Sequence, residues 1–177
     1  MSQVIATFFA GCLVVLSALQ AGNFIATERA FVAPSSTDFA VQETVGVKQL
    51  PMLLELRNSG KNTATIEELT AGITHQLPPE PIYFEAQKFA FAPIIPGGST
   101  KRILPFETNW GEATANGVKT GSLPFYIFGR IRYSDSFSWI MGFKETGFCF
   151  IHTPGSPIAP FETCLERAFT YTSLQRP

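Results

Sequence analysis

Cys149 and His152 are the residues whose types and spacing come closest to a catalytic site. A thiol beside an imidazole is the arrangement that activates a cysteine nucleophile. The segment around them alternates like a β-strand, however, and residues three apart on a strand point to opposite faces of a sheet. We therefore expect a structural cysteine and an ordinary histidine, and we assign no catalytic residue.

Cys149 also has a second candidate partner, Cys164. The two cysteines would form a disulfide if the domain lies in an oxidising compartment, and the bridge would tie the C-terminal segment to the last strand. Bridging requires Cα atoms within about 7 Å of each other, and the sequence does not fix that distance. Two buried free thiols remain the alternative.

The other ionisable side chains do not form a recognisable metal or cofactor site. His75 stands alone on its predicted strand, without the second histidine or cysteine that a metal site needs. Glu67 and Glu68 are adjacent and would face apart on a strand, so they do not supply the paired carboxylates of acid–base catalysis. The sequence has neither a glycine-rich phosphate loop nor a serine elbow. We predict no metal, no cofactor and no enzymatic activity, and an enzyme with a site built from the loop 107–121 is the alternative.

Four basic residues, Arg130, Arg132, Lys101 and Arg102, would suit anionic lipid headgroups if they formed one patch. We interpret the two arginines instead as charges on an exposed sheet face, where they discourage edge pairing. The formal net charge is −1, and nucleic-acid binding needs a broad basic face. We therefore expect no nucleic-acid partner.

The elements that must position these residues begin with an apolar segment. No charged residue occurs from Val4 to Ala26, and the first ones after it are Glu28 and Arg29. A transmembrane helix needs about 20 mostly apolar residues, so residues 4–26 predict a membrane anchor with Glu28-Arg29 at its exit into water. Only 15% of the residues are charged, against about 25% in a typical soluble domain. We expect a single-pass membrane protein whose folded domain lies outside the cytoplasm.

Other fates of this segment remain open. A cleaved signal peptide normally starts with basic residues and ends at a site with small residues. Residues 1–3 carry no Lys or Arg, and the best cleavage site, Leu19-Gln20-Ala21, has a large residue where a small one is preferred. A lipidated Cys12 would begin the mature chain, yet the apolar run continues past it. A buried core helix would show a polar stripe, which this segment lacks.

Strand patterns follow the anchor. Met52, Leu54 and Leu56 alternate with more polar residues, and the turn sequence 58–62 comes next. In the following segment, 65–77, the alternation changes phase at Glu67-Glu68, which predicts a β-bulge. The clearest element is a long hairpin with strands at 125–133 and 144–152 and a tip at 134–136. Shorter strands are expected at 29–33, stopped by Pro34 and a turn at 35–38, and at 82–91 and 101–106.

These segments give about seven strands at spacings of roughly 8–15 residues with antiparallel connections. The predicted fold class is all-β: an immunoglobulin-like antiparallel β-sandwich of about seven strands, preceded by one N-terminal transmembrane helix. We divide the chain into an N-terminal membrane anchor (1–26), a β-sandwich domain (27–153) and a C-terminal tail containing Pro154, Pro157 and Pro160 (154–177). No other helix is expected.

Short motifs give the chain a family resemblance. The turn 58–64, with Asn58, Gly60 and Ala64, resembles one found in many bacterial cell-envelope domains of immunoglobulin-like fold. With the exit sequence Glu28-Arg29-Ala30-Phe31 and the hairpin 128–133 and 147–150, the chain resembles uncharacterised bacterial membrane-anchored proteins. These have a single N-terminal transmembrane helix and an immunoglobulin-like β domain. The resemblance implies a fold and a location, and it implies no activity.

The functional expectation follows from these points. We predict a membrane-tethered, non-enzymatic interaction or scaffold domain of the cell envelope, with residues 4–26 in the membrane. A protein partner would add a strand at an exposed sheet edge. A secreted soluble binding domain, released after signal-peptide cleavage, is the main alternative.

Overall fold

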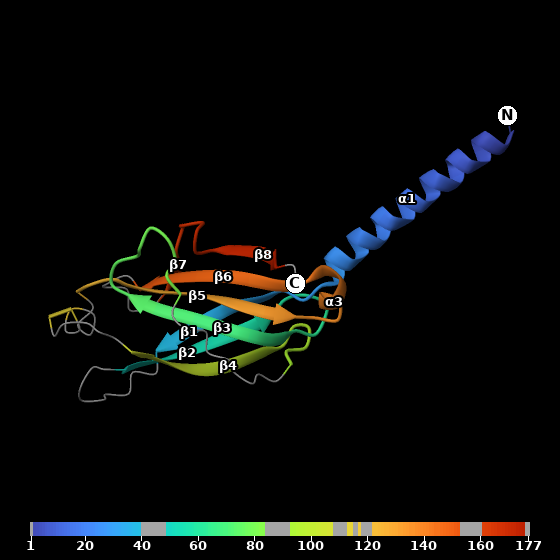
Figure 1. The fold of residues 1–177 in the computed structure, drawn as a ribbon. Coiled ribbons are helices and arrows are strands. Elements are labelled where there is room, and N and C mark those ends of the chain that lie inside the picture. Colours follow the sequence, from blue (N-terminus) through green and yellow to red (C-terminus); the bar gives the residue numbers. More distant parts are fainter. Residues whose placement is uncertain are drawn as a thin grey trace.

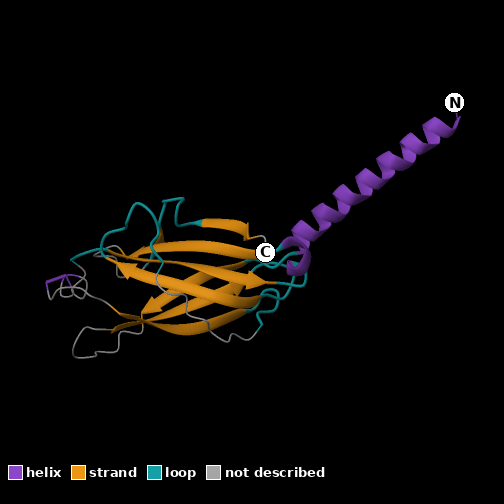
Figure 2. Cartoon of the chain, viewed as in Figure 1, coloured by secondary structure: helices purple, strands orange, loops and turns teal. Residues whose placement is uncertain are grey.

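The structure is a computed structural model that describes residues 2–39, 49–83, 93–107, 113–114, 117, 122–152 and 161–175. Within these ranges one long helix is followed by two antiparallel β-sheets, of three and five strands (Figures 1 and 2). The mostly-β prediction with an N-terminal helix is confirmed at this level. Most of the predicted strand 82–91 and of the loop 107–121 lies outside the described residues.

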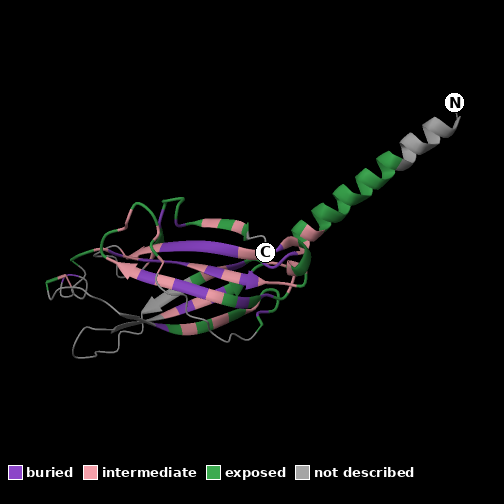
Figure 3. Cartoon of the chain, in the orientation of Figure 1, coloured by how far each residue is buried: buried purple, intermediate pink, exposed green. Residues whose placement is uncertain are grey.

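The N-terminal helix α1 (Ser2–Glu28) projects away from the β domain (Figure 1). Its segment Gly11–Glu28 has a mean hydropathy of 1.2 and no buried residue (Figure 3). The core helix of a soluble protein would bury its apolar side, and this segment buries none. Of the described helices, α1 alone is long and apolar enough to cross a membrane, and a signal sequence near the N-terminus has the same properties.

The three-stranded sheet has the order β1-β2-β4, with β1 at Val32–Phe39, β2 at Gln49–Asn58 and β4 at Ser99–Glu107. The prediction that Pro34 stops the first strand is wrong, because β1 continues through Pro34 and pairs with β2 as far as Phe39 opposite Met52. Proline is tolerated here for two reasons. β1 is an edge strand in this sheet, and its register shifts between Pro34 and Ser36.

The five-stranded sheet is built around the predicted hairpin. Strands β5 (Phe125–Ser134) and β6 (Phe143–His152) pair antiparallel along their length, which confirms that prediction. The connection between them is longer than the expected tip, and it contains a short helix, α3 (Ser138–Met141), where none was predicted.

Strand β3 (Thr65–Thr74) pairs with β5, and the predicted bulge in it is confirmed. The register shifts between Ile66 and Glu68. Because of this shift, Ile66 and Leu69 both face the core, with exposed fractions of 3% and 1%. Regular alternation would have turned one of them to solvent.

Both sheets bury their apolar side chains in one common core (Figure 3). In β2 the predicted face is confirmed, since Leu54 and Leu56 are buried while Arg57 is exposed. Each fully buried large side chain contributes about 1.5–3 kcal/mol. The other buried members of this core are Ala30, Val32, Ala64, Ile66, Leu69, Ile94, Leu104, Phe125, Ile127, Ile131, Tyr133 and Phe148.

Residues 161–175, predicted to belong to a C-terminal tail, lie along β6. Strands β7 (Glu162–Thr163) and β8 (Tyr171–Gln175) both pair with β6. Between them Phe169 is buried, with its ring edge-on to Phe128 at a centroid distance of 5.3 Å. Two strands of the five-stranded sheet therefore come after residue 153, where the predicted β-sandwich domain ends. Strands of two and five residues are too short to give a clear alternating pattern.

Asn58 closes the predicted turn after β2 and is fully buried. Its Oδ1 accepts hydrogen bonds from the main-chain N–H of Phe31 (3.2 Å) and of Gly60 (3.0 Å). Its Nδ2 donates to the carbonyl oxygens of Asn62 (2.7 Å) and Ile94 (2.9 Å). One side chain thus satisfies four main-chain groups and links this turn to the segments before β1 and β4.

We expect Asn58→Ala to destabilise the domain strongly, because it leaves the main-chain groups of Phe31, Gly60 and Asn62 without the bond to Asn58, while the Ile94 carbonyl keeps its bond from the Ala64 N–H. Each such group costs about 1–3 kcal/mol, so the free energy of unfolding should fall by at least about 3 kcal/mol. Chemical denaturation of the full chain in mild detergent measures the change. Asn62→Ala is the control, since it retains the main-chain carbonyl that accepts from Asn58. Equal losses in the two variants would contradict this role of Asn58.

Candidate functional site at the helix exit

Residues 29–31 connect α1 to β1, and two turns enclose this connection. The turn after β2 contributes residues 58–61, and the connection between β5 and β6 contributes residues 135–144. We call these three segments together the exit clamp. They lie at the base of α1, at one end of the β domain (Figure 1).

The central contact of the exit clamp is a buried ion pair between Arg29 and Asp135. Arg29 Nε lies 3.0 Å from Asp135 Oδ2, and Arg29 Nη2 lies 3.1 Å from Asp135 Oδ1. The two side chains are 2% and 0% exposed. This two-point geometry is the strongest way for a guanidinium to bind a carboxylate.

Neighbouring groups add hydrogen bonds to both charges, although Arg29 Nη1 is buried without a partner. Arg29 Nη2 also donates to the hydroxyl of Ser138, the first residue of α3 (3.1 Å), and to the carbonyl of Gly142, directly after α3 (2.8 Å). Asp135 accepts from the main-chain N–H of Ala30 and of Phe137, each at 3.0 Å. A carboxylate that binds the N–H two residues ahead is a common device for closing a turn. Asp135 therefore shapes its own turn and receives Arg29 at the same time.

The turn after β2 holds the other side of the connection through main-chain contacts. Ser59 N–H donates to the Phe31 carbonyl at 2.8 Å, and Lys61 N–H donates to the Arg29 carbonyl at 3.4 Å. A Cβ atom at Gly60 would lie 2.3 Å from the Phe31 nitrogen and 2.5 Å from the Arg29 oxygen. Only glycine allows the two backbones to approach this closely.

The prediction that Glu28-Arg29 marks an exit into water is wrong for Arg29. Glu28 does stay partly exposed and pairs with Lys61 at 2.7 Å, but Arg29 turns into the domain. An arginine directly after an apolar run looks solvated in the sequence, because its acceptor is 106 positions away. In the sequence, Asp135 and Ser138 indicate only a turn between the two strands, and this turn is where the acceptor of Arg29 lies.

The buried charges shift neighbouring pKa values. Burial would raise the pKa of Asp135, but the hydrogen bonds from Arg29 and Ala30 and the positive charge of Arg29 outweigh it. The pKa of Asp135 is therefore lower than usual. Burial lowers the pKa of Lys144, and the nearby Arg29 lowers it further. Lys144 Nζ donates to the Ala30 carbonyl at 3.1 Å, so the main chain compensates part of the cost of burying this amine.

A second polar cluster lies on the outer face of β5 and β6. Glu145, only 6% exposed, accepts a hydrogen bond of 2.6 Å from the Tyr171 hydroxyl of β8. Arg130 lies between two carboxylates, 3.7 Å from Glu145 and 3.2 Å from Glu68. Burial, and after it the hydrogen bond to Glu145, raises the pKa of Tyr171. This cluster attaches β8 to the sheet.

The basic patch considered from the sequence does not form. Arg130 and Arg132 both contact Glu68 on the five-stranded sheet. Lys101 lies on β4 of the other sheet, 3.7 Å from Glu55. These three side chains therefore face carboxylates on two separate sheets, which does not provide the single basic surface that anionic headgroups would need.

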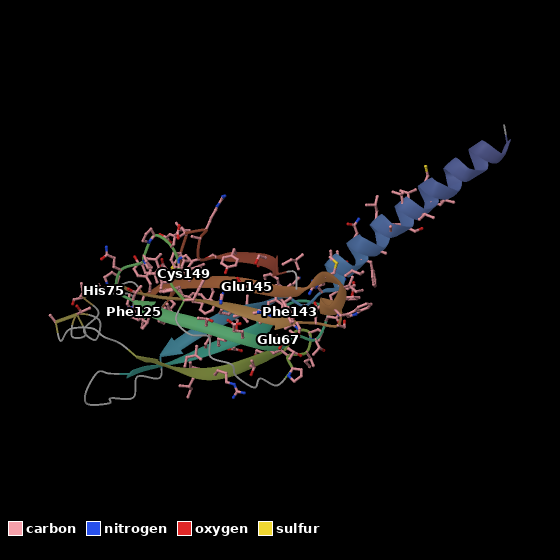
Figure 4. The ribbon with its side chains drawn as sticks, in the orientation of Figure 1. Glu67, His75, Phe125, Phe143, Glu145 and Cys149 are labelled. Atoms are coloured by element: carbon pink, nitrogen blue, oxygen red, sulfur yellow. A yellow bond between two sulfur atoms is a disulfide. The ribbon has the colours of Figure 1, made fainter. Side chains whose placement is uncertain are left out.

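Cys149 lies toward the end of β6 away from the exit clamp (Figure 4). His152 ends this strand, and Cys164 lies beside Cys149 just after β7. Cys149 and Cys164 form a disulfide, so neither is a nucleophile, and the bridge ties the segment after β7 to β6. The His152 ring stacks on Phe125 at 4.9 Å, toward the core shared by the two sheets. Cys149 belongs to a second, smaller cluster of buried residues with Phe128, Cys164 and Phe169. Burial lowers the pKa of His152.

The described residues contain no cluster suited to a metal ion. His75 is exposed just after β3, at the same far end (Figure 4). Among the described residues, no group of three or more His, Cys, Asp and Glu side chains could hold a metal ion. What the arrangement around Arg29 can do is mechanical: it fixes where α1 leaves the domain.

No known protein-family model matches the sequence, and a search of curated proteins found no match. The family resemblance drawn from short motifs is therefore supported only in its coarse form. That form is one N-terminal apolar helix followed by two antiparallel β-sheets.

A double-mutant cycle on Arg29 and Asp135 tests the clamp. We expect Asp135→Ala to lower the free energy of unfolding by about 3–5 kcal/mol, because it leaves the guanidinium buried without its counter-charge. Adding Arg29→Met should recover part of that loss. The control cycle is Glu28→Gln with Lys61→Met, an exposed pair whose coupling should stay below about 1 kcal/mol. Additive losses at Arg29 and Asp135 would contradict a coupled pair.

The stability of the chain should also depend on pH through Asp135. Its pKa is lower in the folded chain than in the unfolded chain, so the unfolded chain binds the proton first as the pH falls. The stabilisation is therefore complete above about pH 4 and is lost as the pH falls through the lower folded value. Denaturation at a series of pH values should show this acid loss in the native chain and a smaller loss in Asp135→Asn. An unchanged slope in Asp135→Asn would refute the assignment.

Proposed function

We propose that this protein is a membrane-tethered, non-enzymatic interaction or scaffold domain of the cell envelope, with its folded part outside the cytoplasm. The observation that carries the proposal is the combination of an exposed apolar helix with a buried ion pair at its base. A segment that serves only as a flexible leash needs no such attachment. Here α1 continues into a connection whose main-chain groups bond to two turns of the domain.

The order of the strands supports an immunoglobulin-like sandwich. The sheets β1-β2-β4 and β3-β5-β6 correspond to the A-B-E and C-F-G strands of that fold. β7 and β8 would then be additions beside the last strand of the second sheet. Many cell-surface domains share this sandwich architecture.

The disulfide supports a location outside the cytoplasm. The bridge between Cys149 and Cys164 would persist in an oxidising compartment and be reduced in the cytosol. An apolar N-terminal helix, whether it remains as an anchor or serves as a signal sequence, directs the following domain to such a compartment.

For the partner, we propose strand addition at β4. This strand ends the three-stranded sheet in the order described, so its outer main-chain groups face away from β2. Ile103 on β4 is 59% exposed and offers an apolar contact beside that edge. An extended peptide would gain main-chain hydrogen bonds there and specificity from alternate side chains.

Fractionation of the full chain tests the tether. We expect the protein to stay in membranes through an alkaline carbonate wash and to keep its N-terminal residues by intact mass. Leu13→Lys with Leu16→Lys should release it, because each charge in the middle of a span costs about 2.5–3.5 kcal/mol. Leu165→Lys is the control, since Leu165 is 94% exposed on the β domain. A soluble product lacking about twenty residues would instead identify α1 as a cleaved signal sequence and the protein as a secreted binding domain.

A further inference from the structure

Helix α3 exposes two large apolar side chains that the fold does not use. Trp139 is 82% exposed and Ile140 is 52% exposed, and α3 has no buried residue. Exposing an indole ring to water costs hydrophobic free energy that burial would recover. Two such neighbours in one turn of helix therefore indicate a surface that something covers.

The position of α3 is fixed relative to α1. Arg29, the residue that follows α1, donates to the Ser138 hydroxyl and to the Gly142 carbonyl, which flank the two exposed side chains. In Figure 1, α3 lies next to the base of α1, at the same end of the domain. Trp139 and Ile140 are therefore held near the point where α1 leaves the β domain.

Helix geometry places this point at the level of the lipid headgroups if α1 spans the bilayer. The hydrocarbon core takes about 20 helical residues, which places its boundary near Phe24 when the span starts at Val4. Arg29 is five residues further along, about 8 Å at 1.5 Å per residue. The headgroup region on one side of a bilayer is about 5–8 Å thick. The exit clamp and α3 then lie against that region.

Other exposed side chains at this end fit the same surface. Phe31, directly after the exit, is 38% exposed, and Leu174 of β8 is 51% exposed opposite Lys144. Lys61 reaches solvent beside Glu28. Tryptophan together with scattered apolar and basic side chains is the composition found where membrane proteins meet the headgroups.

We propose that Trp139 and Ile140 insert into the headgroup region of the bilayer leaflet from which α1 emerges. This contact rests on the proposed membrane tether and adds a second attachment point to it. One helix alone leaves the domain free to rotate and tilt, whereas a helix together with α3 fixes both. The partner is a lipid surface, and its recognition depends on the amphipathic indole rather than on headgroup charge.

Tryptophan emission from the full chain in vesicles tests the contact. The native chain and Trp139→Phe are reconstituted into phosphatidylcholine vesicles, with or without lipid brominated near the headgroup end of its acyl chains. The difference between the two chains isolates Trp139, since the only other tryptophan, Trp110, is common to both. We expect the bromine to quench the native chain more than Trp139→Phe.

The control adds Leu165→Trp to the Trp139→Phe chain. Leu165 is 94% exposed and follows β7, which pairs with the far end of β6, so its tryptophan should show no additional bromine quenching. Equal quenching of the native and Trp139→Phe chains would overturn the lipid contact. Protection of Trp139 from aqueous acrylamide without bromine quenching would overturn it as well, and would identify a second copy of the chain as the covering surface.

A carbonate wash of the same vesicles separates this inference from the tether. If the chain stays in the vesicles and Trp139 is not quenched, the tether stands and the α3 contact is refuted. If the wash releases the chain, both proposals fail.

Discussion

The structure depends on the burial of Arg29 against Asp135. Removing two charges from water costs several kcal/mol for each ion, and their attraction offsets that cost only when the remaining hydrogen-bonding positions are also filled. Here the two side chains meet at 3.0 Å and the main chain of residues 30, 137 and 142 supplies further partners, whereas Arg29 Nη1 is buried without a hydrogen-bond partner. The pair therefore requires residues 29 and 30, the connection between β5 and β6, and α3 to be in place together.

The turn after β2 holds the other side of the connection between α1 and β1. Asn58 is buried and uses its amide to bind four main-chain groups, one of them the N–H of Phe31. Gly60 lets the turn approach the Arg29 carbonyl. Since β2 belongs to one sheet and β5 and β6 to the other, both sheets hold the connection that leads to α1. A force on the helix would therefore be transmitted to the whole domain rather than to one strand.

The two ends of the β domain differ in chemistry. At the helix end there are buried charges, a short helix and exposed aromatic side chains. At the far end two contacts secure the C-terminal segment: the disulfide between Cys149 and Cys164, and the edge-on contact of Phe161 with the stacked rings of Phe125 and His152. The residues that looked most reactive in the sequence serve packing at that end. This division suits a protein that is attached at one end and presents its sheets to partners.

Local patterns in the sequence determined the elements but not their contacts. Alternation identified the hairpin of β5 and β6, and the change of phase at Glu67 located the bulge, because side-chain direction along a strand depends only on near neighbours. The length of the uncharged apolar run predicted α1, because length and composition are also local properties of the sequence. The prediction that Pro34 ends a strand was wrong, because a strand tolerates proline when it lies at the edge of a sheet. Whether a strand lies at an edge is a property of the whole sheet.

Tertiary structure alone decided the helix exit and the path of the C-terminal segment. The partner of Arg29 lies 106 positions away, and no local pattern marks a charge that a distant carboxylate will bury. β7 and β8 are too short to show a period, and they are held by the disulfide and by Phe169, whose contacts come from β5 and β6. The sequence by itself thus determined a helix, a set of strands and their buried faces. How the helix is fixed to the domain was decided by long-range pairing, because the free energy of a buried charge depends on groups that only the fold brings together.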